Sequence, residues 1–250
     1  MAMGLIQCLV WLICFLIRVS SESDDVSVLK GWDLLSPSTN RTIVSAGGVF
    51  ELGFFNPDPS RGERWYVGIW YKNIPEAGRR YVWVANRDNP LNNYNGTLGI
   101  SGATLVIRDP SDNNRIVWSS TSFGSGSPVA KLLDSGNFVL MNSNDEDPGD
   151  ILWQSFDYPT DTLLPGMKLG SDPDVNERTA HINRVLTSWK NAIDPSRGNY
   201  TLSLERRDES WGLSIMGSGN KRMYSSGPWN GAAFFRLPRP SPRRPTPKAP

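Results

Sequence analysis

The stretch Asn137-Phe-Val-Leu-Met141, followed by polar residues and then by Ile151-Leu-Trp153, decides how this chain folds. A short apolar run, a polar turn and a second apolar run that ends on tryptophan are typical of a β-hairpin. Two earlier segments follow the same plan, namely Val49–Phe55 with Trp65–Trp70 and Thr104–Ile107 with Ile116–Trp118. One such hairpin cannot bury its own apolar face, whereas three around a common axis can, with their tryptophans in the middle. The repeat therefore predicts an all-β fold and favours a β-prism over a barrel or a sandwich.

The first residues predict the cellular compartment. Leu5 to Ile17 is apolar except for Gln7, and Arg18-Val-Ser-Ser21 follows. This run is shorter than the roughly 18 to 20 apolar residues of a membrane span, and the small residues after it suit signal peptidase. We interpret residues 1–21 as a cleaved secretory signal, which makes the mature chain secreted and extracellular. An uncleaved anchor is the alternative, because the charged amino-terminal region is weak.

Both cysteines, Cys8 and Cys14, lie in this signal, so the mature chain would have no disulfide and would depend on its apolar core. The 250 residues carry a formal net charge of +1, which points to neither nucleic acid nor an acidic partner. Three sequons fit a secretory route and are predicted N-glycosylation sites on exposed loops: Asn40, Asn95 and Asn199.

The pattern divides the mature chain into three parts. Residues 22–155 read as strands and turns throughout, without a convincing helix. Residues 156–235 contain further strand candidates, at Val185–Trp189, Tyr200–Leu204 and Trp211–Met216, and predict a small or incomplete β module. Residues 236–250 are rich in proline and arginine and are predicted to be a disordered tail, because proline has no N–H and a fixed φ. An SH3-type partner for this tail is set aside, since those domains are cytosolic.

The sequence contains no group of residues that resembles a catalytic site. The single histidine, His181, lies in a polar stretch, and without mature cysteines zinc and Cys–His chemistry are excluded. The acidic run 142–150 lacks the ligand spacing of a calcium loop and occupies a place where a hairpin needs a turn. We therefore expect no enzyme activity, no metal and no cofactor. Surface recognition is the class of function that remains. The tryptophans within apolar runs are expected to be buried, namely Trp70, Trp83, Trp118 and Trp153.

Several longer segments of the sequence resemble one plant family. They are Tyr81-Val-Trp-Val-Ala-Asn-Arg-Asp-Asn-Pro90, Leu152–Pro165, Leu186-Thr-Ser-Trp-Lys190 and Ser226-Gly-Pro-Trp-Asn-Gly231. Together they resemble the extracellular part of S-locus glycoproteins and S-domain (G-type lectin) receptor-like kinases. The resemblance implies a bulb-type lectin domain with the β-prism fold over residues 22–155, followed by a partial S-locus glycoprotein domain over residues 156–235. The kinase motifs of full-length relatives have no counterpart here.

In mannose-binding lectins of this type, each face carries Gln-x-Asp-x-Asn-x-Val-x-Tyr, whose polar residues bond the sugar hydroxyls. The third repeat matches at Asn137 and Val139, and the middle repeat keeps only Val106, with Ile100, Gly102, Thr104 and Arg108 at the other positions. The first repeat does not align. The resemblance thus implies a degenerate carbohydrate site, and the loss of three polar partners, each worth about 1 kcal/mol, argues against mannose binding.

The leading interpretation is a secreted, non-enzymatic recognition protein. The resemblance implies roles in pollen recognition and self-incompatibility, or in the perception of extracellular signals. Its partner would be a full-length S-domain receptor kinase, with this chain as a decoy, or a cell-wall or pollen-coat protein. Two alternatives stay open, namely a carbohydrate-binding lectin that uses a non-standard face and a truncated product without function.

Overall fold

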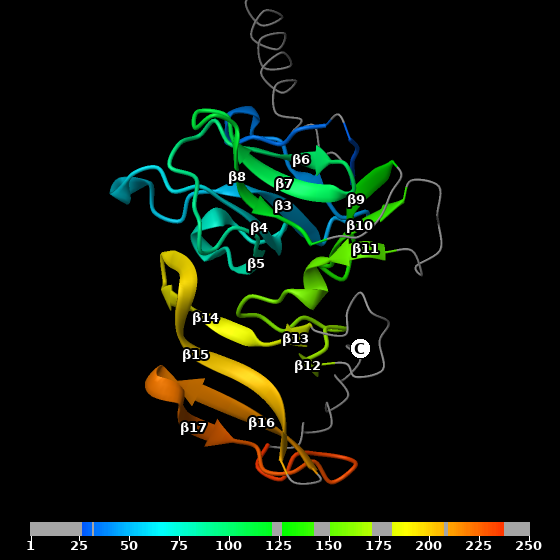
Figure 1. Ribbon diagram of the computed structural model, residues 1–250, viewed down its shortest axis with the longest axis vertical. Helices are drawn as coiled ribbons and strands as arrows, with labels where there is room; N and C mark the ends of the chain where they lie inside the picture. The colour runs from blue at the N-terminus through cyan, green and yellow to red at the C-terminus, as the bar shows by residue number, and fades with distance from the viewer. Residues whose placement is uncertain are drawn as a thin grey trace, which may run out of the picture. The chain divides into compact units, whose positions relative to one another are not determined.

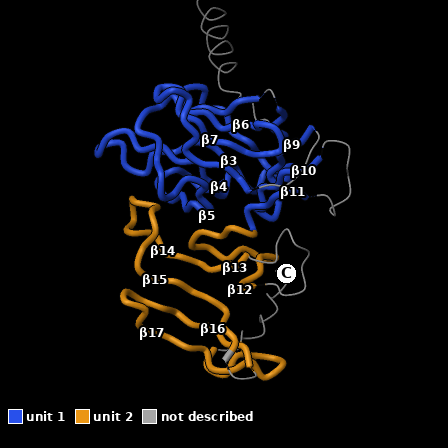
Figure 2. Tube along the Cα trace, in the orientation of Figure 1, with its two compact units in different colours: residues 1–156 blue, residues 157–250 orange. Residues whose placement is uncertain are grey.

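A computed structural model describes residues 27–31, 33–121, 127–142, 151–171, 182–207 and 210–237, with only the backbone of Arg207. In these ranges the regular elements are β-strands and short 3₁₀ turns, which confirms the predicted all-β class (Figure 1). The chain divides into two compact units, residues 1–156 and 157–250 (Figure 2). The predicted signal, His181, residues 143–150 of the acidic run and residues 238–250 of the tail lie outside the described residues.

Unit 1 is a β-prism built from three antiparallel sheets. The first sheet has the order β2 (Ile43–Val44), β3 (Phe50–Phe55), β4 (Tyr66–Tyr71) and β5 (Tyr81–Val84). The second consists of β6 (Thr97–Ser101), β7 (Thr104–Asp109) and β8 (Arg115–Ser119). The third has the order β1 (Val28–Leu29), β9 (Pro128–Leu132), β10 (Phe138–Asn142) and β11 (Ile151–Gln154), so the first of the described strands completes the last sheet of the prism. Short 3₁₀ turns occur at η1 (Pro37–Thr39), η2 (Pro59–Arg61), η3 (Glu76–Gly78) and η5 (Ser155–Asp157).

Three tryptophans, one from each sheet, meet at the centre of unit 1. The ring centroids of Trp83 and Trp118 lie 6.1 Å apart, those of Trp83 and Trp153 5.9 Å, and those of Trp118 and Trp153 5.8 Å. All three pairs pack edge to face, an arrangement worth about 0.5–1.5 kcal/mol per pair beyond area burial. Trp83 and Trp153 are buried as predicted, whereas Trp118 is only half-buried.

The first repeat is displaced by one strand from its predicted position. The sequence pattern paired Val49–Phe55 with Trp65–Trp70 and placed Trp70 at the centre, but the central residue is Trp83 of β5. Side chains alternate along a strand, and Ile69 of β4 pairs with Trp83, so its neighbour Trp70 points to the outer face. Trp70 is buried there, as predicted, but not against the other tryptophans.

Each sheet of the prism contains the same local register. An aliphatic residue of the inner strand pairs with the central tryptophan: Ile69 with Trp83, Ile107 with Trp118, and Leu140 with Trp153. In all three sheets the register shifts immediately after the aliphatic residue, at a β-bulge. Because a bulge bends its strand and increases the twist, a bulge at the same place in each sheet helps three sheets to curve around one centre.

A side-chain hydrogen bond closes each of these strand pairs. The N–H of Leu105 donates to Ser120 Oγ, and the N–H of Phe138 donates to Ser155 Oγ, both at 2.9 Å. In the first sheet the N–H of Val67 donates to Asn86 Oδ1, also at 2.9 Å. All three acceptors are buried, so each satisfies a backbone donor that would otherwise lose its bond to water. We refer to this contact as the closing hydrogen bond.

Unit 2 consists of a two-stranded ribbon and a four-stranded antiparallel sheet. The ribbon is β12 (Gly170–Ser171) with β13 (Asn183–Arg184). The sheet has the order β14 (Leu186–Asn191), β15 (Asp194–Arg207), β16 (Ser210–Gly217) and β17 (Lys221–Ser225), with η6 (Ser218–Asn220) between the last two. The three strands predicted in this region are confirmed as β14, β15 and β16. Arg184 Nε donates to Asp157 Oδ1 at 2.8 Å, and this buried ion pair joins the ribbon to the start of the unit.

The sheet of unit 2 contains a fourth copy of the prism repeat. Ile215 pairs with Tyr224, and the register shifts immediately after Ile215. The N–H of Leu213 donates to Ser226 Oγ at 2.9 Å, which reproduces the closing hydrogen bond at the same offset from Ile215. The aliphatic residue, the bulge and the serine therefore recur, while tyrosine replaces tryptophan. Unit 2 has the local geometry of one prism sheet.

Replacement of Trp83 by alanine is expected to destabilise unit 1 by about 3–5 kcal/mol, because it removes a buried aromatic ring and two of the three central contacts. The matched control is Tyr94→Ala, which removes an aromatic side chain that is 51% exposed and is expected to change stability by less than about 0.5 kcal/mol. Equilibrium unfolding in urea measures both. Equal stabilities for the two variants would contradict the central role of Trp83.

Candidate functional site

The outer faces of the three prism sheets are the candidate binding surfaces. On β4, β7 and β10 the residues adjacent to Ile69, Ile107 and Leu140 point away from the central tryptophans, because side chains alternate along a strand. The lectin-like motif of the third repeat lies on this outer face of β10 and in the turn before it. Strand register therefore decides which residues of the other two sheets occupy the equivalent positions.

The register aligns the first repeat, which the sequence alone did not. Equivalent positions are counted from the aliphatic residue that pairs with the central tryptophan, which is Ile69 in the first sheet and Leu140 in the third. By this count Tyr66 takes the position of Asn137, Gly68 that of Val139, and Trp70 that of Met141. None of the three matches the motif. The first face therefore carries no polar motif residue on its inner strand.

The register also corrects the middle repeat by one residue at the start of its motif. Ser101 pairs with Thr104, just as Leu133 lies opposite Asn137, so Ser101 and not Ile100 occupies the position of the motif glutamine. Two residues separate Ser101 from Thr104, whereas three separate Leu133 from Asn137, and a comparison by sequence spacing misses this difference of one residue. Val106 keeps its place opposite Gly99.

The first face is closed by its own aromatic side chains. The rings of Phe55 and Tyr81 stack with centroids 3.6 Å apart, and Trp70 meets Tyr81 edge to face. Trp70 Nε1 donates to Glu51 Oε2 at 2.8 Å, and the guanidinium carbon of Arg79 lies 4.6 Å from the centre of the Trp70 ring. Burial raises the pKa of the Tyr81 phenol, and the charge of Arg79 opposes this shift. Phe55 and Trp70 are consequently buried on the face where the lectin motif would be open.

Two glycines allow these rings to lie flat on the sheet. A Cβ atom at Gly53 would lie 3.0 Å from the Trp70 ring, and one at Gly68 would lie 2.6 Å from Phe55 Cε1. Gly68 occupies the position of Val106 and Val139. The rings therefore fill the space that valine side chains fill in the other two repeats.

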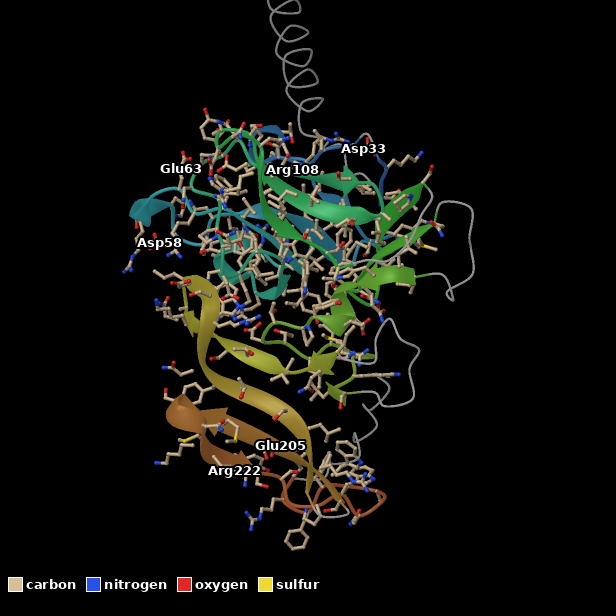
Figure 3. All side chains as sticks on the ribbon, viewed as in Figure 1. Asp33, Asp58, Glu63, Arg108, Glu205 and Arg222 are labelled. Carbon is tan, nitrogen blue, oxygen red and sulfur yellow. The ribbon has the colours of Figure 1, made fainter. Side chains whose placement is uncertain are left out.

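An arginine lies along the second face. Arg108 Nη2 donates to Ser101 Oγ at 3.3 Å, and Nη1 donates to the Asn114 carbonyl at 3.5 Å. Figure 3 labels Arg108. Val106, between the two ends of β7, is only 6% exposed. Leu34 approaches the same face, since a Cβ atom at Gly99 would lie 2.6 Å from Leu34 Cδ2. This face presents a guanidinium and apolar side chains in place of the motif's polar residues.

The third face contains the predicted residues Asn137 and Val139, which are 6% and 1% exposed. Asn137 Nδ2 donates to Gln154 Oε1 at 2.8 Å, and its Oδ1 accepts from Ser155 Oγ and from the N–H of Phe156, both at 3.2 Å. Ser155 also accepts the closing hydrogen bond of this sheet. The amide of Asn137 thus connects β10 to the segment after β11 and is occupied by bonds within the protein.

The three sequons lie at different kinds of position, and the side chains of all three asparagines are exposed. Asn40 follows η1 in the left-handed conformation, at φ 49°. Asn95 lies in the turn before β6, and its Nδ2 donates to Ser111 Oγ at 3.1 Å. Asn199 lies within strand β15 and not in a loop as predicted, because β15 continues through the sequon.

Neither a membrane-spanning helix nor a cluster of metal ligands occurs in the described part of the chain. Within it, no helix is long and apolar enough to span a membrane. Within the same ranges, no three His, Cys, Asp or Glu side chains gather in a way that could hold a metal ion.

The surface that sequence reasoning missed lies on unit 2. Trp211 and Trp229 are both exposed, and so are Tyr200 and Met223. The alternation in Tyr200–Leu204 and in Trp211–Ile215 is the signal that could have indicated an apolar sheet face. Sequence patterns do not show whether a second layer covers such a face.

Sequence comparisons show which known proteins this chain is similar to. The family model described as D-mannose binding lectin matches residues 80–190. An S-locus-specific glycoprotein of Brassica oleracea is 46% identical over 231 residues, which cover 91% of this chain and 50% of that protein. The G-type lectin S-receptor-like serine/threonine-protein kinase SRK of Arabidopsis thaliana is 48% identical over 229 residues, covering 90% of this chain and 25% of that protein. The chain thus spans half or less of the length of these relatives.

Among solved structures, a monomeric monocot mannose-binding lectin from Gastrodia elata aligns with a TM-score of 0.37 and 17% identity, covering 52% of this chain and 96% of that one. The relatives confirm the resemblance to S-locus glycoproteins and S-domain receptor-like kinases that the sequence segments indicated. The chain is similar to the D-mannose binding lectin family over residues 80–190 and, over about nine-tenths of its length, to the plant S-locus glycoproteins and S-domain receptor-like kinases.

Proposed function

We propose that this chain is a secreted, glycosylated recognition protein that binds another protein and performs no catalytic step. Its β-prism serves as a scaffold and not as a mannose receptor. The observation that carries this proposal is the state of Asn137, the one polar motif residue that remains, whose amide bonds Gln154, Ser155 and Phe156 within the protein. A sugar hydroxyl would have to displace these bonds, and a buried group left without a partner costs about 1–3 kcal/mol.

The other two faces support the same proposal. The first is closed by Phe55, Trp70 and Tyr81, and the second carries Arg108 bonded along β7. Neither offers the convergent donors and acceptors that recognition of sugar hydroxyls requires. The lectin-type core is retained while the polar residues for mannose are replaced, which is consistent with recognition of a protein.

The relatives indicate which partners to test. They include an S-locus-specific glycoprotein and receptor-like kinases. We propose that the partner is either a full-length S-domain receptor kinase, which this chain would bind as a decoy, or a cell-wall or pollen-coat protein. The physiological setting would be pollen recognition or the perception of another extracellular signal.

A binding panel tests the proposal. Residues 22–250, produced as a secreted chain, are expected to show no saturable binding to a glycan array that includes mannosides, and saturable binding to the purified ectodomain of an S-domain receptor relative or to a pollen-coat protein fraction. Asn137→Ala is expected to lower stability by about 1–3 kcal/mol, because Phe156 N–H and Ser155 lose their acceptor, without changing the array result. Mannoside binding that disappears in Asn137→Ala would overturn the proposal in favour of a lectin.

Secretion and modification form a separate prediction. The secreted chain is expected to begin at Glu22 and to carry glycans at Asn40, Asn95 and Asn199, since all three side chains are exposed. Each single Asn→Gln variant should therefore lose one glycan and migrate one step faster on a denaturing gel, and enzymatic deglycosylation should remove all three glycans. Amino-terminal sequencing and intact mass measure these features. A secreted product that retains Leu5–Ile17 would contradict the cleaved signal.

A further inference from the structure

The register of β6, β7 and β8 places an arginine among aliphatic side chains on the second face of the prism. Val106 pairs with Gly99, and a Cβ atom at Gly99 would lie 2.6 Å from Leu34 Cδ2, so Leu34 lies beside Val106. Arg108 is two residues from Val106 on the same side of β7, and it pairs with Ile116 of β8. We define the Arg108 patch as Leu34, Val106, Arg108 and Ile116.

Two aliphatic side chains of the Arg108 patch are exposed, although paired backbone carries them. Leu34 is 52% exposed and Ile116 is 50% exposed. Leu35, the neighbour of Leu34, is fully buried and exchanges two backbone hydrogen bonds of 2.9 Å with Leu98 of β6. Ile116 belongs to β8, which pairs with β7. Because the backbone is already ordered at both positions, a partner that contacts these side chains loses little of its binding energy to ordering.

Arg108 has no carboxylate partner among the described residues. Its bonds to Ser101 Oγ at 3.3 Å and to the Asn114 carbonyl at 3.5 Å are long for N–H···O contacts, and both acceptors are uncharged. A guanidinium carries five N–H donors, so these two bonds leave most of them available. Arg115 of β8 differs, because its Nε donates to Asp112 Oδ2 at 2.5 Å. The charge of Arg108 therefore lacks the counter-charge that Arg115 has.

The carboxylates nearest to Arg108 and Leu34 in sequence have other bonds. Asp33 Oδ2 accepts from the N–H of Lys30 at 2.9 Å, and Figure 3 labels both Asp33 and Arg108. Asp109 is 4% exposed, and its two carboxylate oxygens accept from Asn93 Nδ2 at 3.0 and 3.1 Å. A carboxylate that pairs with Arg108 would thus have to come from another molecule.

The other two faces carry no charge at the position of Arg108. Counted from the aliphatic residue that pairs with the central tryptophan, Trp70 and Met141 take this position in the first and third sheets. Both side chains are buried, at 2% and 9% exposure, whereas Arg108 is half-buried. The second face therefore differs from its two counterparts in presenting a cation at this point.

We infer that the Arg108 patch binds an acidic segment of a partner protein. An aspartate or glutamate carboxylate of that segment pairs with Arg108, and its aliphatic side chains pack against Leu34 and Ile116. This inference rests on the proposed function, namely binding of a protein, and states the chemistry of the contact. A guanidinium forms two parallel N–H···O bonds with a carboxylate, and apolar neighbours that exclude water strengthen such a pair.

A uronate sugar also carries a carboxylate, but the aliphatic neighbours favour a peptide. The hydroxyls of a sugar need donors and acceptors around them, and Leu34 and Ile116 offer neither. Burying a hydroxyl against such side chains without a hydrogen bond is unfavourable. Aliphatic side chains of a peptide, by contrast, gain from the same contact.

Selection from a random peptide library on the secreted chain 22–250 tests the inference. Enriched peptides are expected to contain aspartate or glutamate flanked by leucine, isoleucine or valine. Arg108→Gln is expected to raise the dissociation constant of a synthetic peptide of the enriched sequence about tenfold or more, because it removes the charged donor. Arg115→Gln is the matched control on the same sheet and should leave binding unchanged. Added salt should weaken binding to the unaltered chain.

Thiol protection gives a second readout in which Arg108 stays intact. Residues 22–250 contain no cysteine, so a single introduced thiol reports one position. The bound peptide is expected to slow alkylation of Ile116→Cys. It should not slow alkylation of Val49→Cys, whose side chain precedes β3 of the first sheet and is 39% exposed in the unaltered chain.

Three results would overturn the inference. They are a selection without acidic peptides, equal peptide binding by Arg108→Gln and the unaltered chain, and tighter binding of an oligogalacturonide than of the peptide with loss in Arg108→Gln. The peptide library contains neither a receptor ectodomain nor a pollen-coat protein. A failed selection therefore contradicts the Arg108 patch, whereas absence of binding to those proteins contradicts the proposed function.

Discussion

Packing between equivalent aliphatic–aromatic rows is the constraint on which the rest of the structure depends. A single antiparallel sheet with one apolar face is not stable in water and must bury that face against a second layer. In unit 1 three sheets satisfy one another, and Trp83, Trp118 and Trp153 form the centre with mutual edge-to-face contacts. Among the described residues of unit 2, the strand β12 of the short ribbon approaches a sheet of the same design at Leu204. The same local geometry therefore produces a filled core in one unit and a half-buried apolar face in the other.

The outer faces of the prism are free to diverge because the core does not depend on them. The positions that carry a lectin motif in the third repeat are filled by aromatic rings over glycines in the first and by an arginine in the second. Asn137 keeps the residue type of the motif, but its amide now holds the segment after β11 in place. A motif residue can thus survive as a structural residue after its neighbours Leu133, Ser135 and Met141 have departed from the motif.

The closing hydrogen bond keeps the same backbone donor position in every copy of the repeat, while the acceptor residue differs. Ser120, Ser155 and Ser226 accept from the backbone two residues before the aliphatic partner, and Asn86 does the same in the first sheet with one additional residue of chain. The longer asparagine side chain reaches the donor from this different position. Because a buried N–H without an acceptor is costly, each copy of the repeat requires some acceptor here, but not a particular residue.

The sequence by itself determined the all-β class, the three prism repeats, the strands of unit 2 and the resemblance to S-domain proteins. Period-two alternation and turn residues are local features, so the strands that they predict are present in the structure. The tertiary structure alone decided that Trp83 and not Trp70 reaches the centre, since one position along a strand reverses the direction of a side chain. It alone showed that Asn137 is bonded internally and that Ile215, unlike its counterparts in unit 1, is only half-buried. Burial and hydrogen-bond partners depend on residues distant in sequence, which no local pattern records.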